Sequence, residues 1–229
     1  MGQRQFTPAV WCALGFTATY MVAAGIGVAF TGDREFLIYL AVVMVSTAVL
    51  VALHLRIGFS PAVIGGLSLL GGLHMAGGLV RPPEGWPVDG RRVLYNLWLV
   101  PDRLKFDQVV HFYGSAVATW ACWQGLRAGT GLSRPTAGPI ALCALAGTGL
   151  GAVNEVTEFL TTRVVFDTNV GGFENTGWDL VCNLAGATLA GIALATARSA
   201  MEDAGILVPA DPQEGVLPEN MASTRARGS

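Results

Sequence analysis

Charged side chains are scarce in this chain of 229 residues. Lys, Arg, Asp and Glu together make up 13% of the sequence, whereas a soluble domain contains about a quarter. The formal net charge is −2, so the chain has no basic excess with which to neutralise a nucleic-acid backbone. The composition therefore disfavours both a soluble domain and a nucleic-acid-binding protein.

The sequence also lacks closely spaced cysteine pairs and a strict glycine period. Its four cysteines all fall inside apolar runs and none belongs to a C-x-x-C pair, which disfavours a secreted disulfide scaffold. The 30 glycines do not recur at the fixed interval of collagen. Hydrophobic residues reach 52% and the mean hydropathy is +0.50, which is too apolar for a disordered chain. A membrane protein is the class that remains.

Long apolar runs are what the sequence does contain. A membrane-crossing helix needs roughly 20 residues, and only helices and closed barrels satisfy every backbone group in lipid. Strand alternation is absent, so helices are favoured. The first run exceeds the core of a signal peptide and is interpreted as a retained anchor. The predicted spans are 7–30, 36–55, 59–80, 106–126, 136–160 and 177–197. We therefore predict an all-α, polytopic membrane helix bundle of six transmembrane helices.

Residues 1–200 are predicted to form this transmembrane domain, and residues 201–229 a disordered polar tail. Six crossings place the connections 31–35, 81–105 and 161–176 on one side and both termini on the other. In the second of these connections the apolar stretch 93–100 is too short to cross, so we expect it to lie at the membrane interface.

Membrane orientation follows from the charges that flank the first predicted helix. The α-amino group and Arg4 precede this helix, and a single Arg34 follows it. Because positive charge favours the cytoplasmic side, we predict cytoplasmic termini in a multi-pass protein of the cell membrane, the inner or plasma membrane. Membrane lipids are then its expected surroundings, and no nucleic acid is expected as a partner.

Polar side chains in the last three apolar runs gather at one depth. Spacings of three and four residues put each set on one face of its helix, and the alternating chain direction brings all sets toward the same membrane face. His74, in the third run, reaches the same level. The residues concerned are Asp107, His111, Asn154, Glu155, Glu158, Asp179 and Asn183. Such side chains inside a membrane are a hypothesis about function, so we predict a polar pocket near one mouth of the bundle.

Several ionised carboxylates in one pocket would repel one another. Some of them must therefore be protonated, paired with His111 or bound to a cation. An oxygen-rich set with one or two imidazoles suits zinc, manganese or iron, although no H-E-x-x-H motif is present. The candidate ligands of a divalent metal are Asp107, His111, Glu155, Glu158, Asp179 and His74. A metal-free proton relay and a purely structural role are the alternatives.

Catalytic and substrate-binding roles are assigned to overlapping sets of residues. His111 and a carboxylate with a raised pKa would suit proton transfer near neutral pH. The candidate catalytic residues are His111, Glu155, Glu158 and Asp179. The candidate substrate-binding residues are Arg91, Arg92, Arg103, Lys105 and Asn183. The four cationic residues among them would hold an anionic headgroup.

Three strings in the last three runs resemble signatures of a known family. They are FDQVVHF at 106–112, NEVTE at 154–158 and DLVCNLAGA at 179–187, followed by Gly191. Their order and spacing are similar to the Asp/His, Glu and Asp/Asn/Gly motifs of the VanZ-like membrane proteins and of the related DUF2238-type group typified by the bacterial inner-membrane protein YjdF. The resemblance covers residues 106–191 and implies a multi-pass protein of the cell envelope whose biochemical activity is unsettled.

Two functions of different kinds follow from this pocket. The first is a membrane-embedded enzyme or metal-binding protein that acts on a lipid or envelope-precursor substrate at one leaflet. The second is a proton- or cation-coupled transporter, which the position of the pocket near one surface disfavours because carrier sites usually lie at the midplane. A non-catalytic accessory protein, whose polar residues only organise packing, is a further alternative. The sequence leaves enzymatic activity and oligomeric state open.

Overall fold

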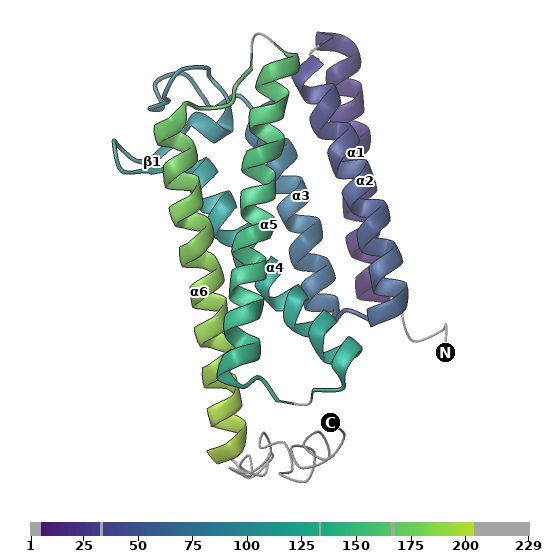
Figure 1. The fold of residues 1–229 in the computed structure, drawn as a ribbon. Helices are drawn as coiled ribbons and strands as arrows, with labels where there is room; N and C mark the ends of the chain where they lie inside the picture. Colours follow the sequence, from purple (N-terminus) through teal and green to yellow (C-terminus); the bar gives the residue numbers. More distant parts are fainter. Residues whose placement is uncertain (1–5, 33, 133, 166–167, 204–229) are drawn as a thin grey trace, which may run out of the picture. The chain divides into compact units, whose positions relative to one another are not determined.

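The structure is a computed structural model that describes residues 6–32, 34–132, 134–165 and 168–203. In these ranges the chain forms six long α-helices (Figure 1). The first five helices, and the sixth as far as Ala195, belong to one unit, Met1–Ala195. Their bounds are α1 (Pro8–Thr31), α2 (Arg34–Ile57), α3 (Pro61–Leu79), α4 (Phe106–Thr130), α5 (Ala137–Val164) and α6 (Phe173–Asp203). The predicted tail, 201–229, lies outside the described residues from position 204 onward.

Five helices of the described chain, α1, α2, α3, α5 and α6, are long and apolar enough to cross a membrane. The remaining helix, α4, has 25 residues and is therefore ~37 Å long, more than the hydrocarbon thickness. Its hydropathy is lower because polar side chains lie along it. Those of Gln108, His111, Ser115 and Thr119 are buried. The predicted all-α polytopic membrane bundle is thus confirmed, with these polar side chains of α4 buried in its interior.

Sequence signals at the helix ends explain where the helices begin. Thr7 and Ser60 precede Pro8 and Pro61, and both hydroxyl side chains accept a hydrogen bond from a backbone N–H in the first turn. Such caps satisfy N–H donors that have no partner within the helix. Proline suits the first position because the N–H that it lacks would have no partner there. At its other end α1 stops at Gly32, whose φ of 66° is the left-handed cap that glycine favours.

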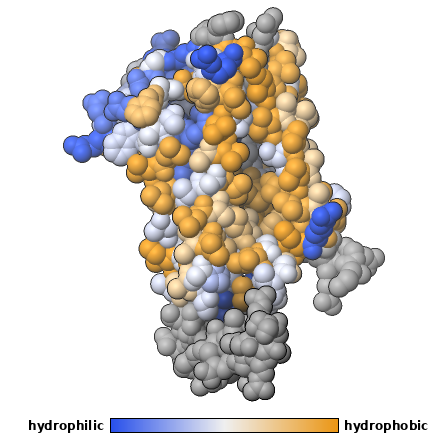
Figure 2. All heavy atoms as spheres, in the orientation of Figure 1, coloured by the Kyte–Doolittle hydropathy of each residue, from blue (hydrophilic) through white to orange (hydrophobic). Residues whose placement is uncertain are grey.

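The connections between α1 and α2, α3 and α4, and α5 and α6 lie at one end of the bundle (Figure 1), as the count of six crossings predicts. Hydrophilic residues gather at this end, while hydrophobic residues cover the flank of the helices (Figure 2). Below we refer to it as the loop end.

The long connection at the loop end is ordered rather than a simple interfacial segment. It contains a 3₁₀ turn, η2 (Leu94–Asn96), and two strands, β1 (Trp98–Val100) and β2 (Leu104–Lys105). The strands pair antiparallel, with Trp98 opposite Lys105. Tyr95 belongs to the stretch 93–100 that we expected at the membrane interface, and its hydroxyl donates to the His74 backbone carbonyl on α3 at 2.9 Å.

Small residues bring α4 and α6 into close contact. A Cβ atom at Gly186 of α6 would overlap the backbone carbonyl of Phe112 on α4. The neighbouring Ala187 and Ala190 are buried as well. In lipid, helix association depends on such close approach, and here it fixes α6 against the polar face of α4.

Candidate metal site at the loop end

Three helices carry the polar residues that meet below the loop end. α4 supplies Asp107 and His111 in its first turns, α5 supplies Glu155 and Glu158 near its end, and α6 supplies Asp179 in its early turns. We refer to these five residues as the His–carboxylate cluster. His111, Glu155 and Asp179 are buried, with Asp179 fully so at 0% exposure, and Asp107 and Glu158 are half-buried. The structure therefore brings together the residues that the sequence placed at one depth.

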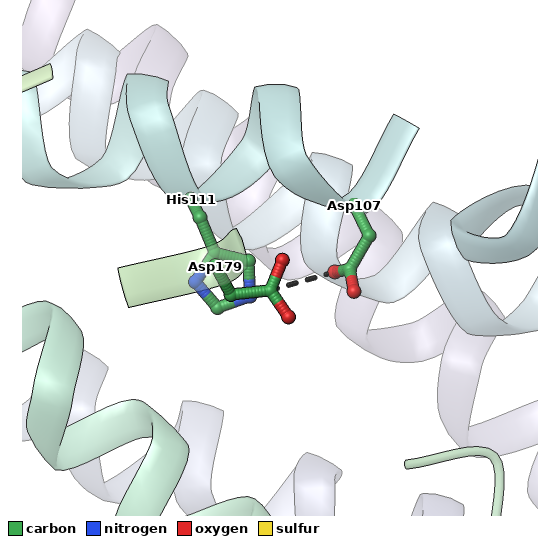
Figure 3. Close-up of side chains that lie close together, drawn as sticks. All are labelled: Asp107, His111 and Asp179. Atoms are coloured by element: carbon green, nitrogen blue, oxygen red, sulfur yellow. Dashed lines mark ion pairs between the residues drawn. The ribbon is translucent and has the colours of Figure 1, made fainter. Parts of the chain in front are cut away.

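His111 lies at the centre of the cluster. Its Nδ1 atom is 3.2 Å from Glu155 Oε1, and its Nε2 atom is 3.5 Å from Asp107 Oδ1. Figure 3 shows Asp107, His111 and Asp179 pointing toward one another, with the His111–Asp107 pair dashed. A neutral imidazole donates a single proton, so it can serve only one of these two carboxylates as a donor.

The donor atoms form two overlapping groups that share His111. One group is Asp107, His111 and Asp179, and the other is His111, Glu155 and Glu158. In each group one atom per residue lies within 4.8 Å of the others. Zinc lies about 2.0–2.2 Å from its nitrogen and oxygen ligands, so donor atoms around one ion stand at most about twice that distance apart. The limit of 4.8 Å within each group is slightly wider than that spacing.

Several buried carboxylate atoms lack a satisfying partner. Among the described residues, Asp179 Oδ1 and both Glu155 oxygens are buried and make no hydrogen bond, although Glu155 Oε1 has its ionic contact with His111. A buried charge without compensation is strongly destabilising. These oxygens therefore call for a proton or a cation.

Asn175 joins two carboxylates of the cluster and was missed by the sequence analysis. Its Nδ2 atom donates to Asp179 Oδ2 at 2.5 Å and to Asp107 Oδ2 at 3.3 Å, and its Oδ1 atom accepts from Lys105 Nζ at 3.1 Å. The last predicted span begins at residue 177, whereas α6 begins at Phe173. The signal was the spacing of four between Asn175 and Asp179, which becomes informative once both lie on one helix.

Asn183 lies one turn beyond Asp179 on α6 and is 1% exposed. Its Oδ1 atom accepts a hydrogen bond from Ser115 Oγ at 2.8 Å, while its Nδ2 atom has no partner among the described residues. Ser115 follows His111 by four residues and so lies on the same face of α4. This spacing is the sequence signal that could have identified Ser115 as a neighbour of the cluster.

The predicted substrate-binding cations divide between two places. Arg91, Arg103 and Lys105 line a polar cleft of about 780 Å³ outside the cluster. Lys105 also forms an ion pair with Asp89 at 2.6 Å. Arg92 does not line this cleft, and its Nη1 atom donates to a backbone carbonyl of the same connection. Substrate binding by these residues stays a prediction.

His74, the sixth candidate ligand, lies outside both donor groups. Its ring packs edge-on against Tyr39 and Tyr95, with centroids 6.1 and 5.5 Å away. Burial raises the pKa of the Tyr95 hydroxyl well above its ordinary value, so this group stays protonated as the donor to the backbone carbonyl of His74. Metal ligation by His74 remains a prediction from the sequence.

A bundle of membrane-crossing helices that encloses a His–carboxylate cluster beneath a polar cleft is a multi-pass integral membrane protein. The chain belongs to the DUF2238 family, described as predicted membrane proteins, whose sequence model matches residues 9–200. The resemblance to the DUF2238-type group is confirmed by this match, while the likeness to VanZ-like proteins stays a prediction. Comparisons with curated proteins and with solved structures gave no match.

Proposed function

We propose that this membrane protein binds a divalent metal ion, zinc, manganese or iron, in the His–carboxylate cluster and uses it on a lipid or envelope-precursor substrate. The single observation behind the proposal is the convergence of four carboxylates from three helices on one buried imidazole. An ion would offset the repulsion among the carboxylates, and donors of oxygen with one imidazole nitrogen suit these metals.

The contacts of His111 favour one of the two donor groups as the primary ligand set. A histidine that binds a metal usually donates its other ring N–H to a carboxylate or carbonyl. Glu155 stands at Nδ1 at 3.2 Å, which leaves Nε2 to face Asp107 and Asp179. We therefore assign the ion to Asp107, His111 Nε2 and Asp179, with Glu155 orienting the imidazole.

This assignment leaves one carboxylate available for acid–base chemistry. Glu158 is half-buried beside the ligand set, and its Oε1 atom accepts a hydrogen bond from Asn154 at 2.7 Å. A metal-bound water becomes a nucleophile near neutral pH when a nearby base accepts its proton. Glu158 would take that role, and the polar cleft with Arg103 and Lys105 would receive an anionic headgroup.

The test is the metal content of the detergent-purified protein, measured by elemental mass spectrometry after exposure to zinc and removal of excess metal. We expect near-stoichiometric metal in the wild type and almost none in Asp179→Asn. Glu155→Gln should retain the site with about ten- to hundredfold weaker affinity. The matched control is Glu174→Gln, because Glu174 is an exposed carboxylate on the same helix. Equal metal loss in the control, or none in Asp179→Asn, would contradict the proposal.

A proton- or cation-coupled transporter is the second candidate, and a chain of polar contacts supports it. Lys105 contacts Asn175, which contacts Asp107 and Asp179, and His111 continues the chain to Glu155. Intramembrane carboxylates and histidines often form such proton relays. Reconstituted vesicles would show substrate-dependent proton flux if this function holds, and no flux in His111→Ala.

A purely structural cluster in an accessory protein can be distinguished from the metal-binding protein and from the transporter by the unfolding temperature of a variant. If the residues only hold the helices in register, Asp179→Asn should lower the unfolding temperature in detergent while leaving metal content and proton flux at background in every variant, the wild type included.

A further inference from the structure

A cavity of about 240 Å³ lies on the membrane side of the cluster, and all six helices contribute residues to its lining. Its exposed wall is mostly apolar, although polar side chains such as those of Ser46, Thr47 and Asn154 line it as well. The aliphatic side chains of the wall include Val42, Leu50, Leu67, Leu70 and Leu150. A cavity whose wall is mostly apolar favours an apolar ligand. In a membrane the apolar ligands at hand are lipid chains.

The cavity opens sideways, between α2 and α5. Val42 on α2 and Leu150 on α5 both line it, yet they are 37% and 54% exposed on the outside of the bundle. Figure 2 shows this flank hollowed and lined with hydrophobic residues. A chain from the surrounding bilayer can therefore enter without passing through the polar loop end.

At its other end the cavity reaches the cluster, where its lining becomes polar. His111 and Asn183 are among the residues that line it there. Asn183 Nδ2 is a buried donor without a partner in the described chain, and a buried donor of this kind needs an acceptor. Because Asn183 follows Asp179 by four residues, it lies ~6 Å deeper along α6.

Four kinds of chemistry thus follow one another with depth: the cationic cleft, the carboxylate cluster, the unpartnered amide donor of Asn183 and the mostly apolar cavity. A phospholipid presents its groups in the same order, with a charged headgroup, a phosphate, an ester carbonyl and an acyl chain. The correspondence is most specific at Asn183, because an ester carbonyl supplies the acceptor that its amide lacks.

We propose that this cavity binds one acyl chain of a phospholipid, which enters between α2 and α5 and places its ester carbonyl at Asn183 and its phosphate at the cluster. The position of the phosphate rests on the metal site proposed above. Binding of the chain rests only on the cavity, its side opening and Asn183. The substrate class of the protein is then a phospholipid rather than a water-soluble precursor.

The experiment is a titration of the delipidated, detergent-purified protein with phosphatidylglycerol, followed by native mass spectrometry. We expect saturable binding of one lipid per chain. Leu50→Trp fills the cavity and should weaken binding by about tenfold or more. Val49→Trp is the matched control, because the neighbouring Val49 is 52% exposed and does not line the cavity; it should bind as the wild type does.

A second measurement covers the case in which Leu50→Trp does not fold. Phosphatidylglycerol with a photoreactive group at mid-chain, reconstituted with the wild type in vesicles, should label Leu67 and Leu70 inside the cavity as well as outward residues. Labelling of outward residues alone, or equal lipid affinity in Leu50→Trp and Val49→Trp, would overturn the proposal.

The metal content of the same samples separates this inference from the proposed function. Saturable lipid binding in a protein that holds no metal would support the chain site and contradict the metal site. Stoichiometric metal without saturable lipid binding would contradict the chain site and leave the metal proposal standing.

Discussion

A single amide, that of Asn175, holds two carboxylates of the cluster side by side. Its Nδ2 atom bonds to both Asp107 and Asp179, while its Oδ1 atom receives the Lys105 ammonium. Two carboxylates in contact repel each other unless donors, protons or a cation lie between them. Asn175 therefore reduces the repulsion between these two carboxylates, as the proposed ion would. It also orients two of the three assigned ligands.

Replacing Asn175 should consequently weaken the metal site without removing a ligand. For Asn175→Leu we expect metal affinity to fall by about ten- to hundredfold, since partners that orient ligands have effects of this size. Competition with a chromogenic zinc chelator measures the change. Glu174→Gln, one residue earlier and exposed, should leave the affinity as it is. Unchanged affinity in Asn175→Leu would show that the amide does not orient the ligands.

Much of the cluster follows from residue spacing alone. Asp107 with His111, Glu155 with Glu158 and Asp179 with Asn183 are pairs three or four residues apart, and helical geometry places each pair on one face. Spacing cannot assign contacts between helices, however. The approach of Glu155 to His111 Nδ1 rather than Nε2 depends on how α5 packs against α4, which no pattern in either helix records.

At the scale of the helices, the crossing of α4 and α6 positions Asp179 next to His111. Gly186 permits this crossing because a side chain there would overlap the Phe112 carbonyl, which is backbone and cannot turn aside. A Cβ atom at Gly149 on α5, by contrast, would have no neighbouring atom within 4 Å. The two glycines thus differ in what a methyl group would meet.

Gly186→Ala should therefore destabilise the bundle by about 1–3 kcal/mol, the usual cost of overpacking. Gly149→Ala, by contrast, should be neutral or slightly stabilising, since alanine exceeds glycine in helix propensity by about 1 kcal/mol. Thermal unfolding in detergent, followed by circular dichroism, compares the two. Equal unfolding temperatures for both variants would argue against a tight α4–α6 contact.

The helix bounds show what an apolar pattern can and cannot predict. The predicted spans locate all six helices, yet α5 continues to Val164 and α6 begins at Phe173, each four residues beyond the predicted limit. Hydropathy marks where a helix enters lipid, whereas a helix continues as long as its backbone bonds are made. For the same reason the sequence identified 93–100 as apolar but not as a turn and a strand held by pairing with Leu104 and Lys105.

At the scale of the whole molecule, orientation in the membrane determines which compartment the polar cleft faces. We predict cytoplasmic termini, which places the loop end outside. In a variant without native cysteines, Glu84→Cys at the loop end should react with a membrane-impermeant maleimide in intact cells. Leu132→Cys, between α4 and α5 at the opposite end, should react only after permeabilisation. The reverse pattern would place the cleft in the cytoplasm.

The central claim is that His111 and the carboxylates bind one metal ion, and the coordination shell of that ion tests it most directly. X-ray absorption spectroscopy of the protein loaded with one equivalent of zinc should show only nitrogen and oxygen ligands at about 2.0–2.2 Å, with the scattering of a single imidazole. That imidazole signal should disappear in His111→Ala. Sulfur ligands at about 2.3 Å, or an unchanged spectrum in His111→Ala, would contradict the account.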